Sequence, residues 1–169
     1  MYFMTYQLPE ITDATPDHIA GILTLQDLNQ IDRGGMLSVS LPRAFLETAV
    51  ADLPVIVACR GGDVVGYLLS TSFAAQAHIP LVQLMLRSYA SPPSAYICGP
   101  ICVAESERGQ GLARAMFDAL RQRLPGRECI SFIRRDNTAS LRAYLKMGMK
   151  DVASFTHDGI LHAVVVHSG

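Results

Sequence analysis

One short loop carries the residues best suited to chemistry. Arg108-Gly109-Gln110-Gly111 follows an apolar run and precedes a predicted helix over 111–124. The first four N–H groups of a helix lack internal partners, and the helix dipole adds about half a positive charge there. Glycine lets a ligand approach the backbone closely, and Arg108 adds a permanent cation. These features predict a phosphate-binding loop, although an isolated Gly-x-Gly also fits a plain strand-to-helix turn.

Other ligand-binding motifs are missing from the sequence. The loop lacks the Gly-Lys-Ser/Thr ending of a P-loop, and Arg114 stands where a dinucleotide fingerprint needs its third glycine. The five histidines show no metal-ligand spacing, so we expect no metal site. The four cysteines form no Cys-x-x-Cys pair and are interpreted as small core residues in a reducing cytoplasm.

A second group of polar residues lies near the C-terminus, in a predicted helix over 139–147. Asn137, Ser140 and Tyr144 are spaced so that they share one helix face. A phenol on such a face can hydrogen-bond to a leaving group and return a proton to it, so Tyr144 is the candidate general acid. A tyrosine packed between helix and sheet would show the same spacing.

The candidate general base is a carboxylate. Glu105, just past the end of a predicted strand, is the first choice, and Glu107 and Asp136 follow. Each of these carboxylates also fits an ordinary surface or helix-capping position. Cys98 and Cys102 offer a different chemistry, a covalent acyl intermediate, but apolar neighbours raise a thiol pKa and disfavour it.

The two motifs together resemble a known family. Residues 108–113 (Arg-Gly-Gln-Gly-Leu-Ala) resemble the Arg/Gln-x-x-Gly-x-Gly/Ala signature of the GNAT superfamily, with Val103 five residues upstream. Residues 137–148 resemble its second motif, Asn-x-x-Ser-x-x-x-Tyr-x-Lys-x-Gly, and only Met149, often Phe in the family, departs nearby. The motifs occur in the expected order, one strand apart, and cover about residues 96–150.

The resemblance implies an acetyl-CoA-dependent N-acetyltransferase in which an amine attacks the thioester directly in a ternary complex. The strand end would pair with the pantetheine arm, and a backbone N–H near its start would polarise the thioester carbonyl. Tyr144 and Glu105 would be catalytic. The cofactor-binding residues would be Ile101, Cys102, Val103, Arg108, Gly109, Gln110, Gly111, Leu112, Ala113, Asn137, Ser140 and Lys146. A non-catalytic acyl-CoA-binding or sensing domain remains the alternative; it would need the loop but not Tyr144.

Several elements must position these residues. In chain order we expect a strand over 2–8, helices over 16–29 and 42–51 with a loop over 30–38 between them, a hairpin over 55–59 and 64–70, a buried helix or lid within 74–90, a strand over 96–104, the helix over 111–124, a strand over 129–133, the helix over 139–147 and a strand pair over 151–156 and 160–167. Pro100 cannot donate to a sheet ladder and predicts a bulge at Gly99-Pro100.

The expected fold is one domain over residues 1–169. Alternating strands and helices in the second half predict an α/β or α+β sheet covered by helices. The resemblance implies a mixed central sheet of about six to seven strands flanked by helices. The bulge would splay strand 96–104 from strand 129–133 and open a slot for the acyl-CoA.

Charge is unevenly distributed along the chain. Residues 1–107 contain four basic and ten acidic side chains, whereas residues 108–169 contain ten basic and five acidic ones. The basic half suits a polyanionic cofactor, and the acidic half suits a cationic amine. A pI near 6.5 argues against nucleic acid, and no signal peptide or membrane-length apolar run is evident, so we expect a cytoplasmic protein.

The acceptor is the least determined partner. A small-molecule or peptide amine is expected, with the loop 30–38, the second helix and residues 74–95 lining its site, as the resemblance implies. The sequence does not name the amine, the length of the acyl group or the oligomeric state. A homodimer is compatible with pairing of the final strands across a two-fold axis.

Overall fold

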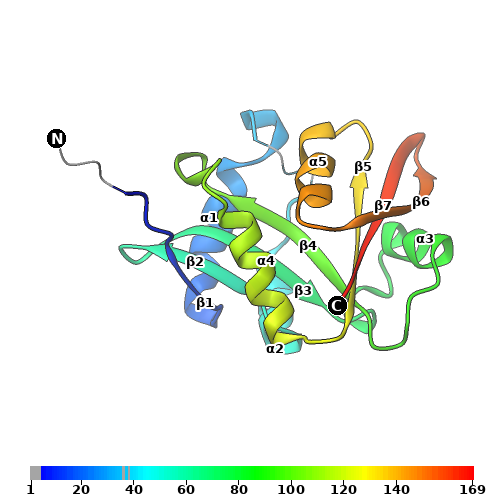
Figure 1. The fold of residues 1–169 in the computed structure, drawn as a ribbon, viewed down its shortest axis with the longest axis horizontal. Coiled ribbons are helices and arrows are strands. Elements are labelled where there is room, and N and C mark those ends of the chain that lie inside the picture. Colours follow the sequence, from blue (N-terminus) through cyan, green and yellow to red (C-terminus); the bar gives the residue numbers. More distant parts are fainter. Residues whose placement is uncertain (1–4, 36, 38) are drawn as a thin grey trace.

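The computed structural model describes residues 5–35, 37 and 39–169, and a seven-stranded sheet forms its centre (Figure 1). The strands occur in the order β1-β2-β3-β4-β5-β7-β6. Their bounds are β1 Glu10–Asp13, β2 Ile56–Arg60, β3 Asp63–Thr71, β4 Tyr96–Val103, β5 Glu128–Arg134, β6 Lys150–His157 and β7 Ile160–Ser168. Neighbours are antiparallel except β4 and β5, which are parallel, so the predicted mixed sheet is confirmed.

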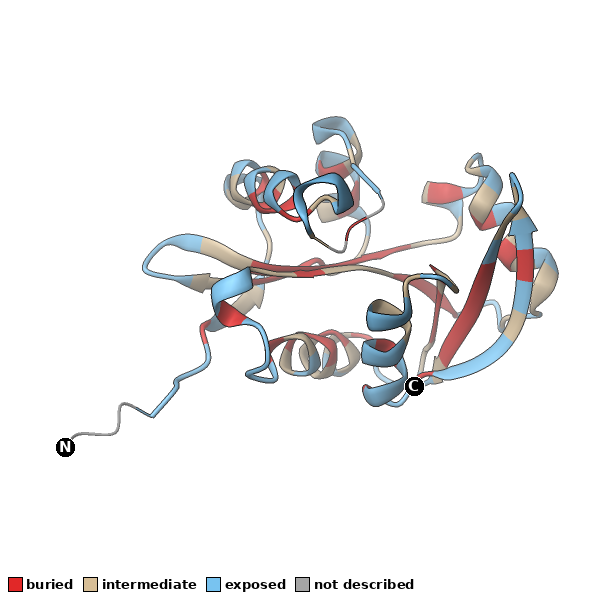
Figure 2. Ribbon diagram, turned by 90° about the horizontal axis from the view of Figure 1, so that it is seen from above, coloured by how far each residue is buried: buried red, intermediate tan, exposed pale blue. Residues whose placement is uncertain are grey.

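Helices cover both faces of this sheet (Figure 2). The α-helices are α1 Ile19–Leu28, α2 Arg43–Asp52, α3 Pro80–Ser88, α4 Leu112–Arg123 and α5 Thr138–Lys146. Ile22 of α1 and Leu46 of α2 pack in one core cluster with Tyr67 of β3. On the opposite face, α4 packs against β2, β3 and β4. Helix α3 lies on the same side of the sheet as α1 and α2, at the β6 end, because Ile97 and Ile130 pack with α3 whereas Cys98 and Cys129 pack with α4.

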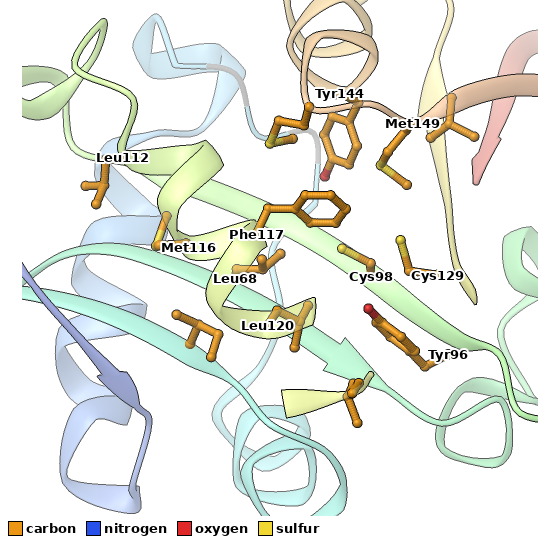
Figure 3. Packing of buried hydrophobic residues seen from close by; sticks show 14 of the residues in the cluster. Leu68, Tyr96, Cys98, Leu112, Met116, Phe117, Leu120, Cys129, Tyr144 and Met149 are labelled. Carbon is orange, nitrogen blue, oxygen red and sulfur yellow. The ribbon is translucent and has the colours of Figure 1, made fainter. Parts of the chain in front are cut away.

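The helix after the candidate loop forms because its apolar side chains recur on one face. Leu112, Met116 and Leu120 recur every four residues and are buried, together with Phe117 (Figure 3). Burying one such side chain contributes about 1.5–3 kcal/mol, so α4 is fixed by packing against the sheet. This rigid attachment holds its N-terminus, and therefore the loop before it, in place.

A bulge interrupts the pairing of β4, as the proline predicted. Leu68 of β3 pairs with Ile101, whereas Ser70 pairs with Cys98, so Gly99 and Pro100 together oppose a single residue of β3. On its other side β4 pairs with β5 only at Tyr96–Cys129 and Ile97–Ile130. Beyond these two pairs the strands separate, which confirms the predicted splay.

The N-terminal segment differs from the sequence prediction. Residues 5–8 form no strand, and the first strand begins at Glu10; residues 2–4 of the predicted strand lie outside the described residues. Side-chain contacts fix this segment instead, because Arg60 donates a 2.8 Å hydrogen bond to the Gln7 carbonyl and the Tyr6 hydroxyl donates one of 2.6 Å to Glu107. Residues 5–8 therefore form a segment outside the sheet that these two contacts hold in place.

The remaining elements lie close to their predicted positions. The helix expected over 16–29 starts with a 3-10 turn at Pro16–His18, and a second 3-10 turn, Ile31–Arg33, lies in the loop expected over 30–38. The segment 74–90 divides into a 3-10 turn, Ala74–Gln76, and α3, which begins at Pro80 as expected. In the described part of the chain, no helix is long and apolar enough to cross a membrane.

Candidate active site

A cavity of about 570 Å³ opens where β4 and β5 separate. One side is formed by the end of β4, the loop before α4 and the first turns of α4 and α5. The other side is formed by residues from the α1–α2 connection, α3 and the β6–β7 hairpin. The predicted site residues that line it are Ile101, Cys102, Val103, Arg108, Gly109, Gly111, Leu112, Ala113, Asn137, Ser140 and Tyr144; Glu105, Gln110 and Lys146 do not.

The end of β4 presents one free edge to this cavity. Ile101, Cys102 and Val103 pair with β3 on one side, and within the described residues no strand pairs with them on the other. An unpaired edge offers backbone N–H and C=O groups to an extended chain. The pantetheine arm of an acyl-CoA is such a chain, with amide groups along its length.

The loop before α4 is shaped by glycine. Gly111 is the N-cap of α4 and has φ +82°, a left-handed conformation that L side chains rarely adopt. The helix ladder begins with Ala115, whose N–H donates to the Gly111 carbonyl, so the N–H groups before it have no partner in the helix. Leu112 and Ala113 line the cavity, whereas Gln110 is exposed outside it.

Arg108 is fixed by two neighbours. Its Nε donates a 3.3 Å hydrogen bond to the Val103 carbonyl, and its other nitrogen donates to the Asn29 side-chain oxygen. Asn29 is buried and donates 2.8 Å to the Leu25 carbonyl of α1. The guanidinium is therefore a positioned cation at the cavity wall. Sequence reasoning missed Asn29, which is 79 residues away along the chain.

Tyr144 lies where the strands diverge, with its ring buried beneath α5 and its hydroxyl toward β4 (Figure 3). A Cβ atom at Gly99 would lie 2.9 Å from this hydroxyl and 3.3 Å from the Ser131 hydroxyl, so the bulge allows its close approach. Burial and the nearby Cys98 raise the pKa of Tyr144, whereas hydrogen bonds with Ser131 and the Ile101 backbone oppose the rise. The phenol is therefore protonated at neutral pH.

The second motif supports Tyr144 from the same helix. Asn137 caps α5, because its side chain accepts a 3.3 Å hydrogen bond from the Ser140 N–H. This cap fixes the first turn of α5 at the cavity wall. The Lys146 side chain is exposed, and its carbonyl accepts a 3.0 Å hydrogen bond from Arg114 of α4, which ties the two helices together.

Comparison with known proteins agrees with this geometry. Residues 22–149 match the Acetyltransferase (GNAT) family. The chain belongs to this family. It is therefore an acyltransferase, and the resemblance inferred from its two motifs is confirmed. No curated protein matches the sequence significantly.

Solved structures share the GNAT fold over nearly the whole chain. An N-acetyltransferase from Staphylococcus aureus Mu50 is 20% identical with a TM-score of 0.69, and 96% of this chain and 99% of that one are covered. A ribosomal-protein-alanine N-acetyltransferase from Brucella melitensis is 22% identical with a TM-score of 0.66, covering 94% and 99%. A protein from Salmonella typhimurium, solved with its cofactor acetyl-CoA, is 15% identical with a TM-score of 0.68, covering 96% and 94%.

The candidate carboxylates of this GNAT enzyme lie in different surroundings. Glu105 is exposed and outside the cavity lining. Glu107 is buried, with one oxygen 2.6 Å from Arg60 and the other accepting a 2.6 Å hydrogen bond from Tyr6, and the Arg60 guanidinium lowers its pKa. Asp136 is paired with Arg134 at 2.6 Å, and this arginine lowers its pKa as well. Glu107 thus anchors the loop before α4 to β2.

The buried thiols are poor nucleophiles. Burial raises the pKa of Cys102 to about 12, despite the opposing charge of Arg108. A hydrogen bond with Cys129 and complete burial raise the pKa of Cys98; Figure 3 shows the two sulfurs close to each other. Because the thiolate is the reactive form, these positions disfavour a covalent acyl intermediate.

The second side of the GNAT cavity is mostly apolar. Phe45, Leu81 and Phe132 line it, together with Leu37 and other aliphatic residues. The polar residues there include Gln76, Arg134, His157, Asp158 and His162. His162, from β7, gave no signal in the sequence, because only the folded hairpin brings it to the cavity.

Proposed function

We propose that this enzyme transfers an acetyl group from acetyl-CoA to a primary amine, which attacks the thioester directly in a ternary complex. The main observation behind this proposal is that one cavity is lined by the loop before α4, by the unpaired edge of β4 and by Tyr144. The Salmonella structure, which holds acetyl-CoA in the same fold, supports acetyl-CoA as the donor. No metal takes part in the proposal.

The donor would occupy the side of the cavity bounded by α4 and α5. The N–H groups at the start of α4 would bind the pyrophosphate, with Arg108 as the neighbouring cation. The pantetheine arm would lie along residues 101–103 as an added strand. Asn137, Ser140, Gln110 and Lys146 stay predicted cofactor contacts, although the last two would have to reach the cofactor outside the cavity.

The bond exchange takes place beside Tyr144. The amine lone pair forms the C–N bond, and a backbone N–H near Ile101 or Cys102 stabilises the oxyanion of the tetrahedral intermediate. The C–S bond then breaks with its electron pair on sulfur. Tyr144 donates a hydrogen bond to this sulfur and supplies the proton that makes the free thiol. Glu105 stays the carboxylate predicted as the base.

The acceptor would enter from the side bounded by the α1–α2 connection and α3. The apolar lining on that side favours an amine carried on an apolar body. The Brucella structure, described as a ribosomal-protein-alanine N-acetyltransferase, makes a peptide with an N-terminal alanine a reasonable candidate. A suitable panel is therefore phenethylamine, spermidine and an alanine-initiated peptide, so that apolar, cationic and peptide amines are compared.

Two measurements test the proposal. Calorimetric titration with acetyl-CoA should show saturable binding that the Arg108→Ala, Gly111→Asp variant loses. Thiol release should then require both acetyl-CoA and an amine of the panel, and Tyr144→Phe should lower kcat about 10- to 100-fold with nearly unchanged acetyl-CoA affinity. No binding at near-millimolar acetyl-CoA would refute the donor assignment. Binding without turnover on any amine would leave the sensing alternative.

A further inference from the structure

His162 occupies an unusual position in the acceptor side of the cavity. It lies on β7, is 5% exposed and lines the cavity wall. Its ring stacks on Phe155, with centroids 4.9 Å apart and planes 6° apart, and meets the edge of Phe132 at 5.9 Å. The two aromatic rings fix the orientation of the imidazole, so its nitrogens point in defined directions.

The hydrogen bonds of His162 determine which nitrogen carries the proton. Nδ1 lies 3.0 Å from the Ile160 carbonyl, and a carbonyl oxygen can only accept. Nδ1 therefore holds the hydrogen in the neutral ring, and Nε2 holds the lone pair. Within the described residues, no hydrogen bond engages Nε2. Nε2 also retains some exposure to solvent, unlike the fully buried polar atoms that have no partner. Nε2 is thus not sealed from solvent, and it belongs to a ring that lines the cavity.

The surroundings keep this imidazole neutral. Burial lowers the pKa of His162 below its ordinary value, and the positive charges of Arg134 on β5 and His157 on β6 act in the same direction. The hydrogen bond to the Ile160 carbonyl opposes this lowering of the pKa more strongly than either charge supports it, and Asp136 opposes it weakly, but burial is the largest effect and the net shift is downward. At neutral pH the ring is therefore a base rather than a cation.

None of the three candidate carboxylates offers an unengaged lone pair at the cavity. Asp136 lies outside the cavity lining, and both its oxygens accept hydrogen bonds from Arg134. Both oxygens of Glu107 are bound by Arg60 and Tyr6, and Glu105 lies outside the cavity lining. We propose that His162 is the general base of this transferase; this inference rests on the proposed acetylation of an amine. Nε2 takes, directly or through one water, the proton that the acceptor ammonium must lose.

The step is balanced in protons and electrons. The ammonium gives one proton to His162 Nε2, and its freed lone pair forms the C–N bond to the acetyl carbon. The C–S bond breaks, its electron pair stays on sulfur, and the thiolate receives a proton from Tyr144. The nitrogen loses a second proton as the amide forms, and this proton restores the Tyr144 phenol. The imidazolium then releases its proton to solvent. The products are the amide, the free thiol of coenzyme A and one proton.

The protonation state is tested first, on the full-length protein without substrate. Long-range ¹H–¹⁵N spectra of the histidine rings, assigned with His162→Asn, should show His162 neutral at pH 7.5 with its hydrogen on Nδ1. A ring that is charged at this pH, or that holds its hydrogen on Nε2, would overturn the proposal. This arm needs no acceptor and is independent of the proposed function.

The role in turnover is tested with a variant that preserves the structural bond. In His162→Asn the side-chain amide can still donate to the Ile160 carbonyl, but the basic Nε2 is lost. With acetyl-CoA and the best amine of the panel, kcat/KM at pH 7 should fall about 100-fold. The loss should shrink toward pH 10, where free amine is abundant without a base. His18→Gln is the control, because His18 lies outside the cavity lining and glutamine can replace it in the capping box with Thr15.

Distinct results separate the possible failures. If His162→Asn lowers kcat/KM equally at all pH values, His162 has a structural role. If only Glu105→Gln shows a pH-dependent loss of kcat/KM, Glu105 is the base. Either result overturns the proposal. If wild-type protein releases no thiol with any amine, the proposed function fails, and the ring spectra still decide the state of His162. Restored turnover of His162→Asn with added imidazole would support the assignment.

Discussion

Replacing Gly99 with alanine tests whether the bulge in β4 exists to admit the Tyr144 hydroxyl. Gly99 has φ +110°, and an added Cβ would lie 2.9 Å from that hydroxyl, where ordinary contacts begin near 3.4 Å. The hydroxyl must therefore move by about half an ångström away from the reaction site. Because misplacement by about 1 Å can cost 100-fold in rate, we expect kcat to fall about 10-fold.

The same substitution has a calculable effect on stability. A non-glycine residue in a sparsely populated φ region costs about 1–3 kcal/mol. Gly62→Ala is the matched control, because Gly62 has φ +86° but nothing within 4 Å of its added Cβ. With about 2–4 °C per kcal/mol for a chain of this size, Gly62→Ala should lower Tm by about 2–12 °C. Gly99→Ala should lower it further, because the clash adds to the strain.

A double-mutant cycle with Tyr144→Phe completes this experiment. Phenylalanine removes the atom that clashes, so Gly99→Ala should change kcat little in that background, and its extra loss of Tm should disappear. Scanning calorimetry and thiol-release kinetics provide the two readouts. The reasoning is refuted if Gly99→Ala turns over like wild type, or if it lowers kcat about 10-fold even without the phenol.

Four further results are expected. Asn29→Ala removes a partner of Arg108, so calorimetry should show acetyl-CoA binding weakened about 3- to 10-fold, which corresponds to the ~1 kcal/mol that one hydrogen bond typically contributes. The pKa of Glu107 is lowered in the folded state. The stability that its carboxylate contributes is therefore complete above about pH 4.5 and is lost as pH falls through the folded-state pKa. Between pH 5 and 3, the Tm of the wild-type protein should fall more steeply than the Tm of Glu107→Gln. Because the pKa of Tyr144 is raised above 10, kcat should show no loss from its ionisation below about pH 10, and a midpoint near 8 assigned to this residue would contradict its burial. Phe117→Ala should lower the free energy of unfolding in urea by about 3–5 kcal/mol, because the ring is fully buried under α4.

The fold was predictable where local pattern and tertiary packing agree. The four-residue spacing of apolar side chains placed α4, and Pro100 placed the bulge, because each rests on short-range stereochemistry. The strand expected over 2–8 was wrong for residues 5–8, since an apolar alternation does not reveal whether a sheet edge is available. Those residues are instead fixed by Arg60 and Glu107, partners more than 50 positions away.

The candidate site shows the same division between local and distant information. The cavity wall bounded by α4 and α5, where we propose that the donor binds, was predictable, because residues 101–113 and 137–144 form two motifs that are each contiguous in the sequence. The acceptor side combines the α1–α2 connection, α3 and the β6–β7 hairpin, and no two of these are adjacent in the sequence. His162 illustrates the consequence: its sequence neighbours are those of an ordinary strand, and only the stack with Phe155 and the Ile160 carbonyl bond give it a fixed tautomer. The reacting proton would thus be handled by a residue whose chemistry exists only in the folded chain.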